Sequence, residues 1–150
     1  MRTQEELSVI IAEYKAAKPY LFEEKRDVPL SEEHLCEIEH AYRIRLPDSF
    51  RQHLKSEGAG SFACGSVYSP DPLSGWSLWT EYALIEEDHA LPRVLPFSDN
   101  GGGDYYCFPI ADGICQDRVV WADHEDGYSV TDCECGDFRG FIVEVCLNPD

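Results

Sequence analysis

No stretch of this sequence approaches the roughly 18 consecutive apolar residues that a membrane-spanning helix requires. The opening residues, MRTQEELSVIIAEYK, also lack the pattern of a secretory signal, because acidic residues interrupt the early charge and the apolar run is short. We therefore expect a cytoplasmic protein that has no membrane as a direct ligand.

Positive charge is scarce. The chain has 12 lysines and arginines against 29 aspartates and glutamates, and its formal net charge is −17 at pH 7. Such a surface repels phosphates, so we expect no nucleic acid as a direct ligand. It attracts basic partners and accelerates their encounter, an effect that weakens with added salt. The simpler alternative is that the charge serves solubility alone.

The signatures of several enzyme classes are missing. The sequence has no G-x-S-x-G elbow for a nucleophilic serine and no G-K-[S/T] of a phosphate-binding loop. The C-x-x-C spacing of a redox dithiol is also absent, which argues against a redox role for Cys133 and Cys135. A single C-x-C is weak support for zinc, although Cys107, Cys115 and His124 could supply further ligands. We therefore predict no catalytic residue, no cofactor and no metal ion.

At 150 residues the chain has the size of one ordinary domain, and its 43% hydrophobic residues are typical of a globular protein. A chain of this length buries about 70% of its unfolded surface, so it does not depend on disulfides. Seven cysteines, an odd number, fit thiols that are mostly reduced and buried. We expect a single domain over residues 1–150.

The first third of the chain carries the pattern of helices. Thr3 and Glu6 form a possible capping box for the first helix, and Ser31 is a good N-cap for the second. A third helix is expected to begin near Pro47 and to stop at Gly58.

Beyond residue 60, short β-like runs replace this pattern, after a loop, SVYSPDPLSGWS, that is rich in proline, glycine and serine. Turns at Ala111–Gly113 and Glu125–Gly127 separate the runs and indicate a meander. Residues 80–90 fit either a strand or a short helix. The runs are RVLPF (93–97), DYYCFPI (104–110), RVVWAD (118–123) and YSV (128–130).

The segment 137–147, DFRGFIVEVCL, supports two interpretations. Its phenylalanines fit helical spacing behind Asp137 as a cap, whereas FIVEV is β-branched and Gly140 weakens a helix. We favour the helix.

Three consecutive glycines stand in SDNGGGDYYCF (98–108). A phosphate loop usually leads into a helix, whereas this one precedes a β-like run, has no lysine or arginine before Arg118, and carries Asp99 and Asp104. We expect a structural turn, permitted by the tolerance of glycine for positive φ, rather than an anion site.

The stretch ADHEDG (122–127) offers acid, base and metal-ligand groups in one place. If the strand continues through it, Asp123 and Glu125 share one face and His124 points to the other, which opposes a local catalytic cluster. A structural histidine is therefore expected. A metal-dependent hydrolase that uses His124 and nearby carboxylates is the alternative.

The order of these motifs resembles the SMI1/KNR4 (SUKH) superfamily. In that family a helix that opens with serine and acidic residues leads to Leu-Pro, an aromatic residue and a helix ending in glycine, as in 30–60 here. A glycine-rich loop entering a strand follows, as in 95–108, and then a strand ending in DHE, as in 119–127. The phenylalanine-rich 137–145 takes the place of the closing helix.

The resemblance covers residues 28–147 and leaves 1–27 as a variable leading helix. It implies an α+β fold in which N-terminal helices pack against a mainly antiparallel β-sheet, with a closing C-terminal helix. Many bacterial members are immunity proteins that neutralise a cognate toxin, often a nuclease, without doing chemistry themselves, and fungal members are regulatory scaffolds. We expect a non-catalytic protein that binds a basic protein toxin, with a regulatory scaffold as the alternative.

On this interpretation the glycine turn serves recognition. It presents an aspartate and two tyrosines beside the acidic hairpin, where tyrosines supply rigid contact area and carboxylates supply steering. The expected partner-binding residues are Asp99, Gly102, Gly103, Asp104, Tyr105, Tyr106, Asp123, His124, Glu125 and Asp126.

Overall fold

The computed structural model describes residues 2–24, 26–88 and 94–147. Within those residues, no helix combines the length and the apolar character needed to cross a bilayer. The helices are α1 (Gln4–Ala17), α2 (Glu32–Tyr42), α3 (Asp48–Ser56), α4 (Leu78–Asp88) and α5 (Phe138–Phe141), which continues as a π-helical turn over Ile142–Leu147. The strands are β1 (Gly60–Phe62), β2 (Gly65–Val67), β3 (Val94–Asp99), β4 (Tyr105–Ala111), β5 (Ile114–Cys115), β6 (Val120–Asp123) and β7 (Ser129–Asp132).

Local capping groups start the helices where the sequence predicts. The Thr3 side chain accepts the N–H of Glu6, and the Glu6 side chain accepts the N–H of Thr3, so the capping box of α1 is confirmed. The Ser31 hydroxyl accepts an N–H at the start of α2, and Asp137 caps α5 in the same way. The helical interpretation of the closing segment is thereby confirmed.

The main sheet is an antiparallel meander in the order β3-β4-β6-β7, with the short β5 paired to β4. Its register places Tyr105 opposite Ala122 and Tyr106 opposite Trp121. The start of β4 therefore lies beside the end of β6, which brings the loop before β4 next to the turn after β6.

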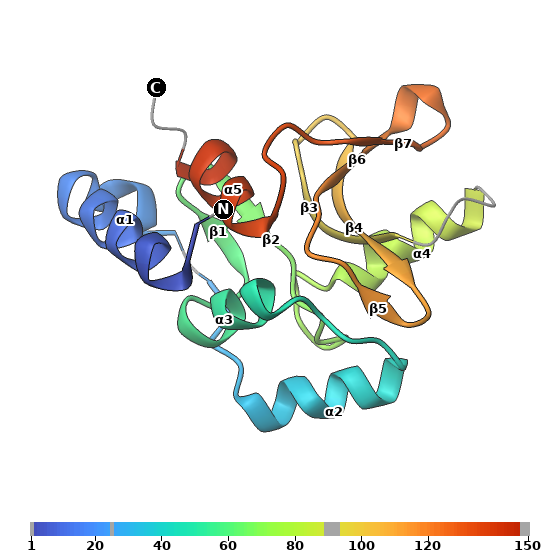
Figure 1. The fold of residues 1–150 in the computed structure, drawn as a ribbon, viewed down its shortest axis with the longest axis horizontal. Coiled ribbons are helices and arrows are strands. Elements are labelled where there is room, and N and C mark those ends of the chain that lie inside the picture. The colour runs from blue at the N-terminus through green and yellow to red at the C-terminus, as the bar shows by residue number, and fades with distance from the viewer. Residues whose placement is uncertain (1, 25, 89–93, 148–150) are drawn as a thin grey trace.

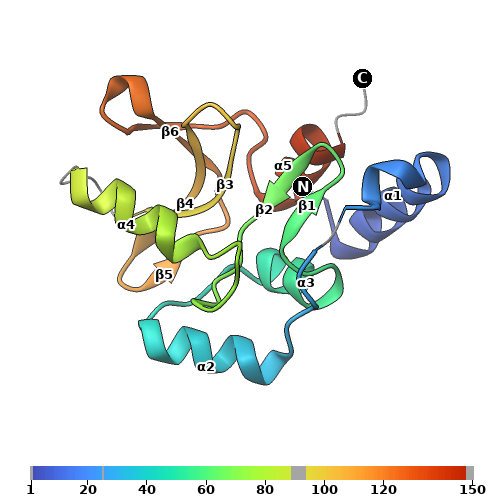
Figure 2. The ribbon, with the colours of Figure 1, turned by 180° about the vertical axis from the view of Figure 1, so that it is seen from behind.

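The sheet lies between two groups of helices, with α4 on one side and α3 and α5 on the other (Figures 1 and 2). Consecutive residues of β4 show the two faces: the Tyr105 hydroxyl donates to Glu81 of α4, while the Tyr106 ring lies 4.9 Å from that of Phe141 in α5. The architecture is α+β, as expected. The leading helix α1 adds Leu7 and Ile11 to the core.

Two segments differ from or extend the sequence interpretation. The ambiguous stretch 80–90 belongs to α4 as far as Asp88, and its last two residues lie outside the described part of the chain, as does Arg93. The region after Gly60 also forms a β1–β2 hairpin that sequence patterns did not reveal. Each of its strands has only three residues, two of them glycine or serine. Such strands are too short and too polar to show an alternation of hydrophobic and polar residues.

Candidate binding face

The glycine loop between β3 and β4 is a turn, as predicted. Gly101 and Gly103 have φ of +79° and +102°, a region that side chains disfavour. The N–H of Gly101 donates to Asp99 Oδ1 at 2.8 Å, and that of Gly102 donates to Asn100 Oδ1 at 2.8 Å. Because these N–H groups are satisfied within the loop, they do not form an anion cradle.

A hydrogen-bonded pair joins this loop to the acidic turn after β6. Asp104 Oδ1 lies 2.6 Å from His124 Nδ1 and also accepts the backbone N–H of His124 at 2.9 Å. The bond from His124 lowers the pKa of Asp104, and the same bond raises the pKa of His124. Asp104 is 15% exposed and His124 38% exposed, so the pair stands at the surface.

The predicted alternation of Asp123, His124 and Glu125 was wrong. β6 ends at Asp123, whose Oδ1 accepts the N–H of Glu125 at 2.9 Å and starts a 3₁₀ turn over His124–Asp126. The strand therefore ends two residues before Glu125, and His124 turns toward Asp104.

Asp104, Asp123 and His124 offer ligand atoms that all lie within 4.8 Å of one another. Among the described residues, this is the group whose geometry suits a metal ion. The imidazole and the Asp104 carboxylate already satisfy each other.

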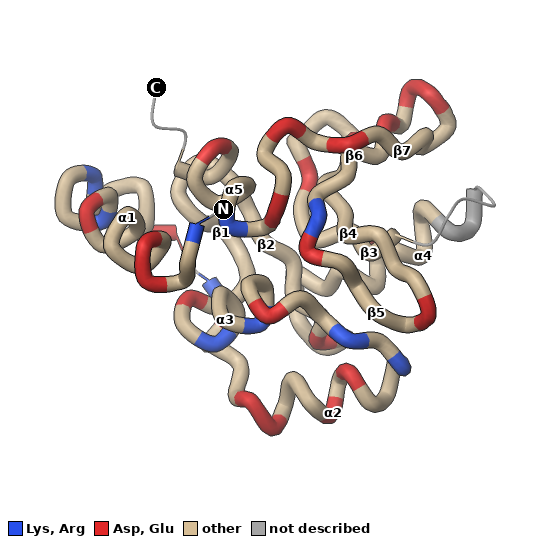
Figure 3. Tube along the Cα trace, in the orientation of Figure 1, with Lys and Arg blue, Asp and Glu red and all other residues tan. Residues whose placement is uncertain are grey.

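The other predicted residues differ in exposure. Glu125 and Asp126 are exposed at the turn, which contains no lysine or arginine (Figure 3). Asp99 is half-buried and accepts the hydroxyl of Tyr68. Tyr105 is only 7% exposed, so it offers little contact area to a partner.

Tyr106 is half-buried beneath a hollow beside the glycine loop, with a volume of about 380 Å³. The β1–β2 turn and the C-terminal helix supply the rest of its wall. This contribution was not predictable from the sequence, because the hairpin lies some 35 residues before the loop along the chain. The residues lining the hollow are Cys64, Gly65, Ser66, Asp99, Asn100, Gly101, Tyr106 and Val145.

Gly103→Ala is expected to lower the free energy of unfolding by about 1–3 kcal/mol. A Cβ at Gly103 would lie 3.2 Å from the His124 ring, and its φ of +102° strains any side chain. Gly102→Ala is the matched control, because its Cβ would meet nothing closer than 3.4 Å and its φ is not positive. Urea denaturation of both variants checks this, and equal losses would contradict the account of the loop.

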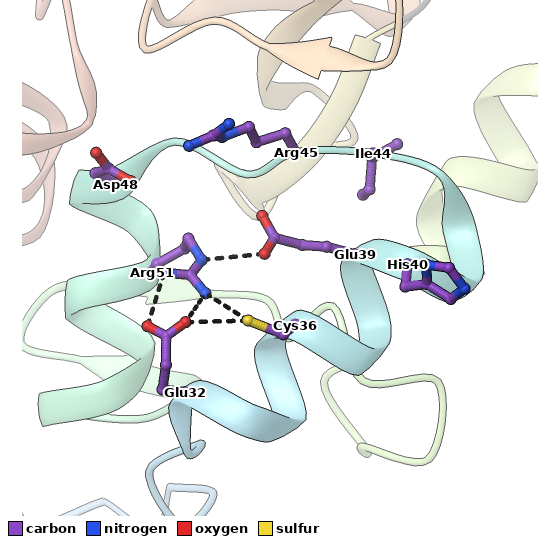
Figure 4. Close-up of a pocket in the computed structure, with 8 residues that line it drawn as sticks. All are labelled: Glu32, Cys36, Glu39, His40, Ile44, Arg45, Asp48 and Arg51. Carbon is purple, nitrogen blue, oxygen red and sulfur yellow. Dashed lines mark hydrogen bonds and ion pairs between the residues drawn. The ribbon is translucent and has the colours of Figure 1, made fainter.

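A second hollow, of about 460 Å³, lies between α2 and α3 (Figure 4). Its centre is Arg51, which forms a two-pronged ion pair with Glu32 and lies 3.3 Å from Glu39. The bond from Arg51 lowers the pKa of Glu32 to about 2. These ion pairs tie the two helices together, so we assign them a structural role.

Comparison with known proteins identifies the architecture. The solved structure of a protein from Pseudomonas syringae pv. tomato is similar, with a TM-score of 0.61 and 22% identity over 94% of this chain and 98% of that one, which shows a shared fold. Among proteins with curated descriptions, none matches the chain. The sequence profile described as SMI1 / KNR4 family (SUKH-1) matches residues 29–138. Because this match spans most of the sequence and includes the glycine loop and the acidic turn, the chain belongs to the SMI1/KNR4 family (SUKH-1).

Proposed function

We propose that this chain is a non-catalytic binding protein of the immunity type, which captures a cognate basic toxin in the cytoplasm and covers its active surface. The main support for the proposal is that hydrogen bonds between Asp104 and His124 join the glycine loop to the acidic turn. This joined surface belongs to a molecule of net charge −17. Membership of the family supports this role, because many bacterial members are immunity proteins.

Electrostatics favour a basic partner at this face. The segment 123–132 contains four carboxylates and no lysine or arginine, and Glu125 and Asp126 project into solvent. Such a cluster attracts a basic surface before contact and raises the association rate, and salt screens the effect. A nuclease holds phosphates with a basic surface, so an acidic inhibitor can occupy that same surface.

Shape contributes as well as charge. The hollow above Tyr106 gives the face a concave part, and the turn at residues 124–126 gives it a projecting part. A tyrosine held by its neighbours loses little side-chain entropy on binding. Tyr106 is so held, since its ring contacts Trp121 and Phe141 at 4.8 and 4.9 Å.

The clustering of Asp104, Asp123 and His124 favours one alternative, a metal-dependent hydrolase. Metal analysis of the purified protein, followed by titration with zinc and manganese, separates the two functions. A stoichiometric ion together with hydrolysis of a substrate would replace the binding proposal.

The binding proposal is tested by immobilising the protein, applying a lysate of the source organism and eluting with rising salt. We expect one basic polypeptide, toxic when expressed alone and harmless when this chain is co-expressed. A captured protein that is toxic in both conditions, or the absence of any partner at low salt, would contradict the proposal.

A further inference from the structure

The C-x-C unit that follows β7 forms a tight turn. The N–H of Gly136 donates to the carbonyl of Cys133 at 3.2 Å, which closes a turn over 133–136. Both ends of the turn are hydrogen-bonded to Val119. The Cys133 N–H donates to the Val119 carbonyl at 3.0 Å, and the Val119 N–H donates to the Gly136 carbonyl at 2.8 Å. The backbone around the two cysteines is therefore fixed by hydrogen bonds.

This turn brings the two thiols into contact. Cys133 Sγ and Cys135 Sγ lie 3.1 Å apart, both as free thiols, and both residues are half-buried and so within reach of a small molecule. The sulfurs need to approach by only about 1 Å to reach the disulfide bond length of about 2.05 Å. The missing C-x-x-C spacing thus does not keep the thiols apart, because the turn replaces the helix that usually presents them.

We propose that Cys133 and Cys135 form a redox-active dithiol that a low-molecular-weight disulfide, of the glutathione class, oxidises to an intramolecular disulfide. First the Cys133 thiol loses its proton and its sulfur attacks the oxidant, so that a mixed disulfide forms and one small thiol departs. The Cys135 sulfur then attacks Cys133, the protein disulfide forms, and the second small thiol leaves. The protein loses two electrons and two protons, and the oxidant becomes two thiols.

The surroundings assign the second step to Cys135. Burial, followed by the hydrogen bond to Cys133, raises the pKa of Cys135, which makes it slow to attack an external oxidant. Its attack on Cys133 in the mixed disulfide is intramolecular and begins from contact, so proximity offsets the low thiolate fraction.

The dithiol lies directly before the closing helix. The same turn leads into Asp137, the cap of α5. Oxidation therefore acts beside the start of the closing helix.

The test treats the native protein with oxidised glutathione, quenches with acid, alkylates the remaining thiols after denaturation and maps tryptic peptides. Cleavage after Arg118 and Arg139 yields one peptide, 119–139, whose only cysteines are Cys133 and Cys135. We expect this peptide to lose the mass of two hydrogens and to carry no alkyl group, and dithiothreitol to reverse the change. The exposed Cys64 is expected to carry glutathione instead.

Two variants sharpen the result. Cys133→Ser is expected to abolish the loss of two hydrogens, whereas Cys64→Ser, which changes an exposed thiol elsewhere, is expected to leave it intact. A wild-type peptide 119–139 that carries two alkyl groups or two glutathiones, under conditions that modify the exposed Cys64, would overturn the proposal.

Discussion

Truncating Phe50 to alanine is expected to lower the free energy of unfolding by about 3–5 kcal/mol. Phe50 is fully buried on α3, and its ring contacts those of Phe108 in β4 and Phe138 in α5, each at 5.4 Å. It therefore joins three elements, and its removal leaves a cavity that no single element can close. Because domains of this size are stable by only about 5–15 kcal/mol, the variant should be marginally folded.

Urea denaturation measures this loss, with Leu73→Ala as the control. Leu73 is 92% exposed, so its truncation should change stability by about 0.5 kcal/mol or less. A loss at Phe50 no larger than that of the control would mean that the sheet and α5 do not pack across α3 as described.

His53→Leu is expected to protect the protein against acid. His53 is buried between the rings of Phe62 and Phe138, and its Nε2 has no hydrogen-bond partner. Burial, and then the charges of Arg26 and Lys15, lower its pKa from 6.5 to about 3. The folded state holds a neutral imidazole that the unfolded chain can protonate.

The sign of the effect follows from this difference. The stability that the neutral His53 permits is fully present above pH 6.5. It declines as the pH falls toward 3, because only the unfolded chain takes up the proton. Between pH 7 and pH 5, protonation of His53 in the unfolded chain should lower the free energy of unfolding of the wild type by about 2 kcal/mol. The leucine variant should not show this loss.

Unfolding in urea at pH 7 and at pH 5 checks this prediction. On acidification, the free energy of unfolding of the leucine variant should rise by about 2 kcal/mol relative to that of the wild type. His40→Gln is the matched control, because His40 is exposed on α2, and it should show no such gain. Identical pH dependence in the wild type and the leucine variant would show that His53 titrates normally.

Features governed by neighbouring residues were predictable from the sequence. The caps at Thr3, Ser31 and Asp137 act through hydrogen bonds to residues three positions away, so the sequence contains both partners. The meander also followed from local turns. The order of the motifs along the chain then predicted the family, and the profile match over 29–138 confirms it.

Contacts between segments that are distant in the sequence were not predictable. The 3₁₀ turn that follows Asp123 brings His124 into contact with Asp104, twenty positions earlier, and no local pattern indicates that contact. The hydroxyl of Tyr105 donates to Glu81 in α4, a helix that the sequence left ambiguous. The contact between Cys133 and Cys135 comes from a turn held by Val119, which spacing rules do not capture.

We propose that the glycine loop and the acidic turn form the surface that binds a basic toxin. The most direct measurement is the association rate constant of the captured partner, over a range of salt concentrations, with Asp104→Asn/Asp123→Asn. The control is Glu33→Gln/Glu37→Gln, which removes the same charge from exposed positions on α2, at the other end of the molecule (Figure 1). Each amide keeps one acceptor oxygen, which is enough for the bonds to the backbone N–H groups of His124 and Glu125.

We expect the face variant to associate roughly tenfold more slowly than the wild type at low salt, and this difference to disappear as the salt concentration rises. The control should stay close to the wild type throughout. Equal rates for the face variant and the control would contradict the placement of the binding surface.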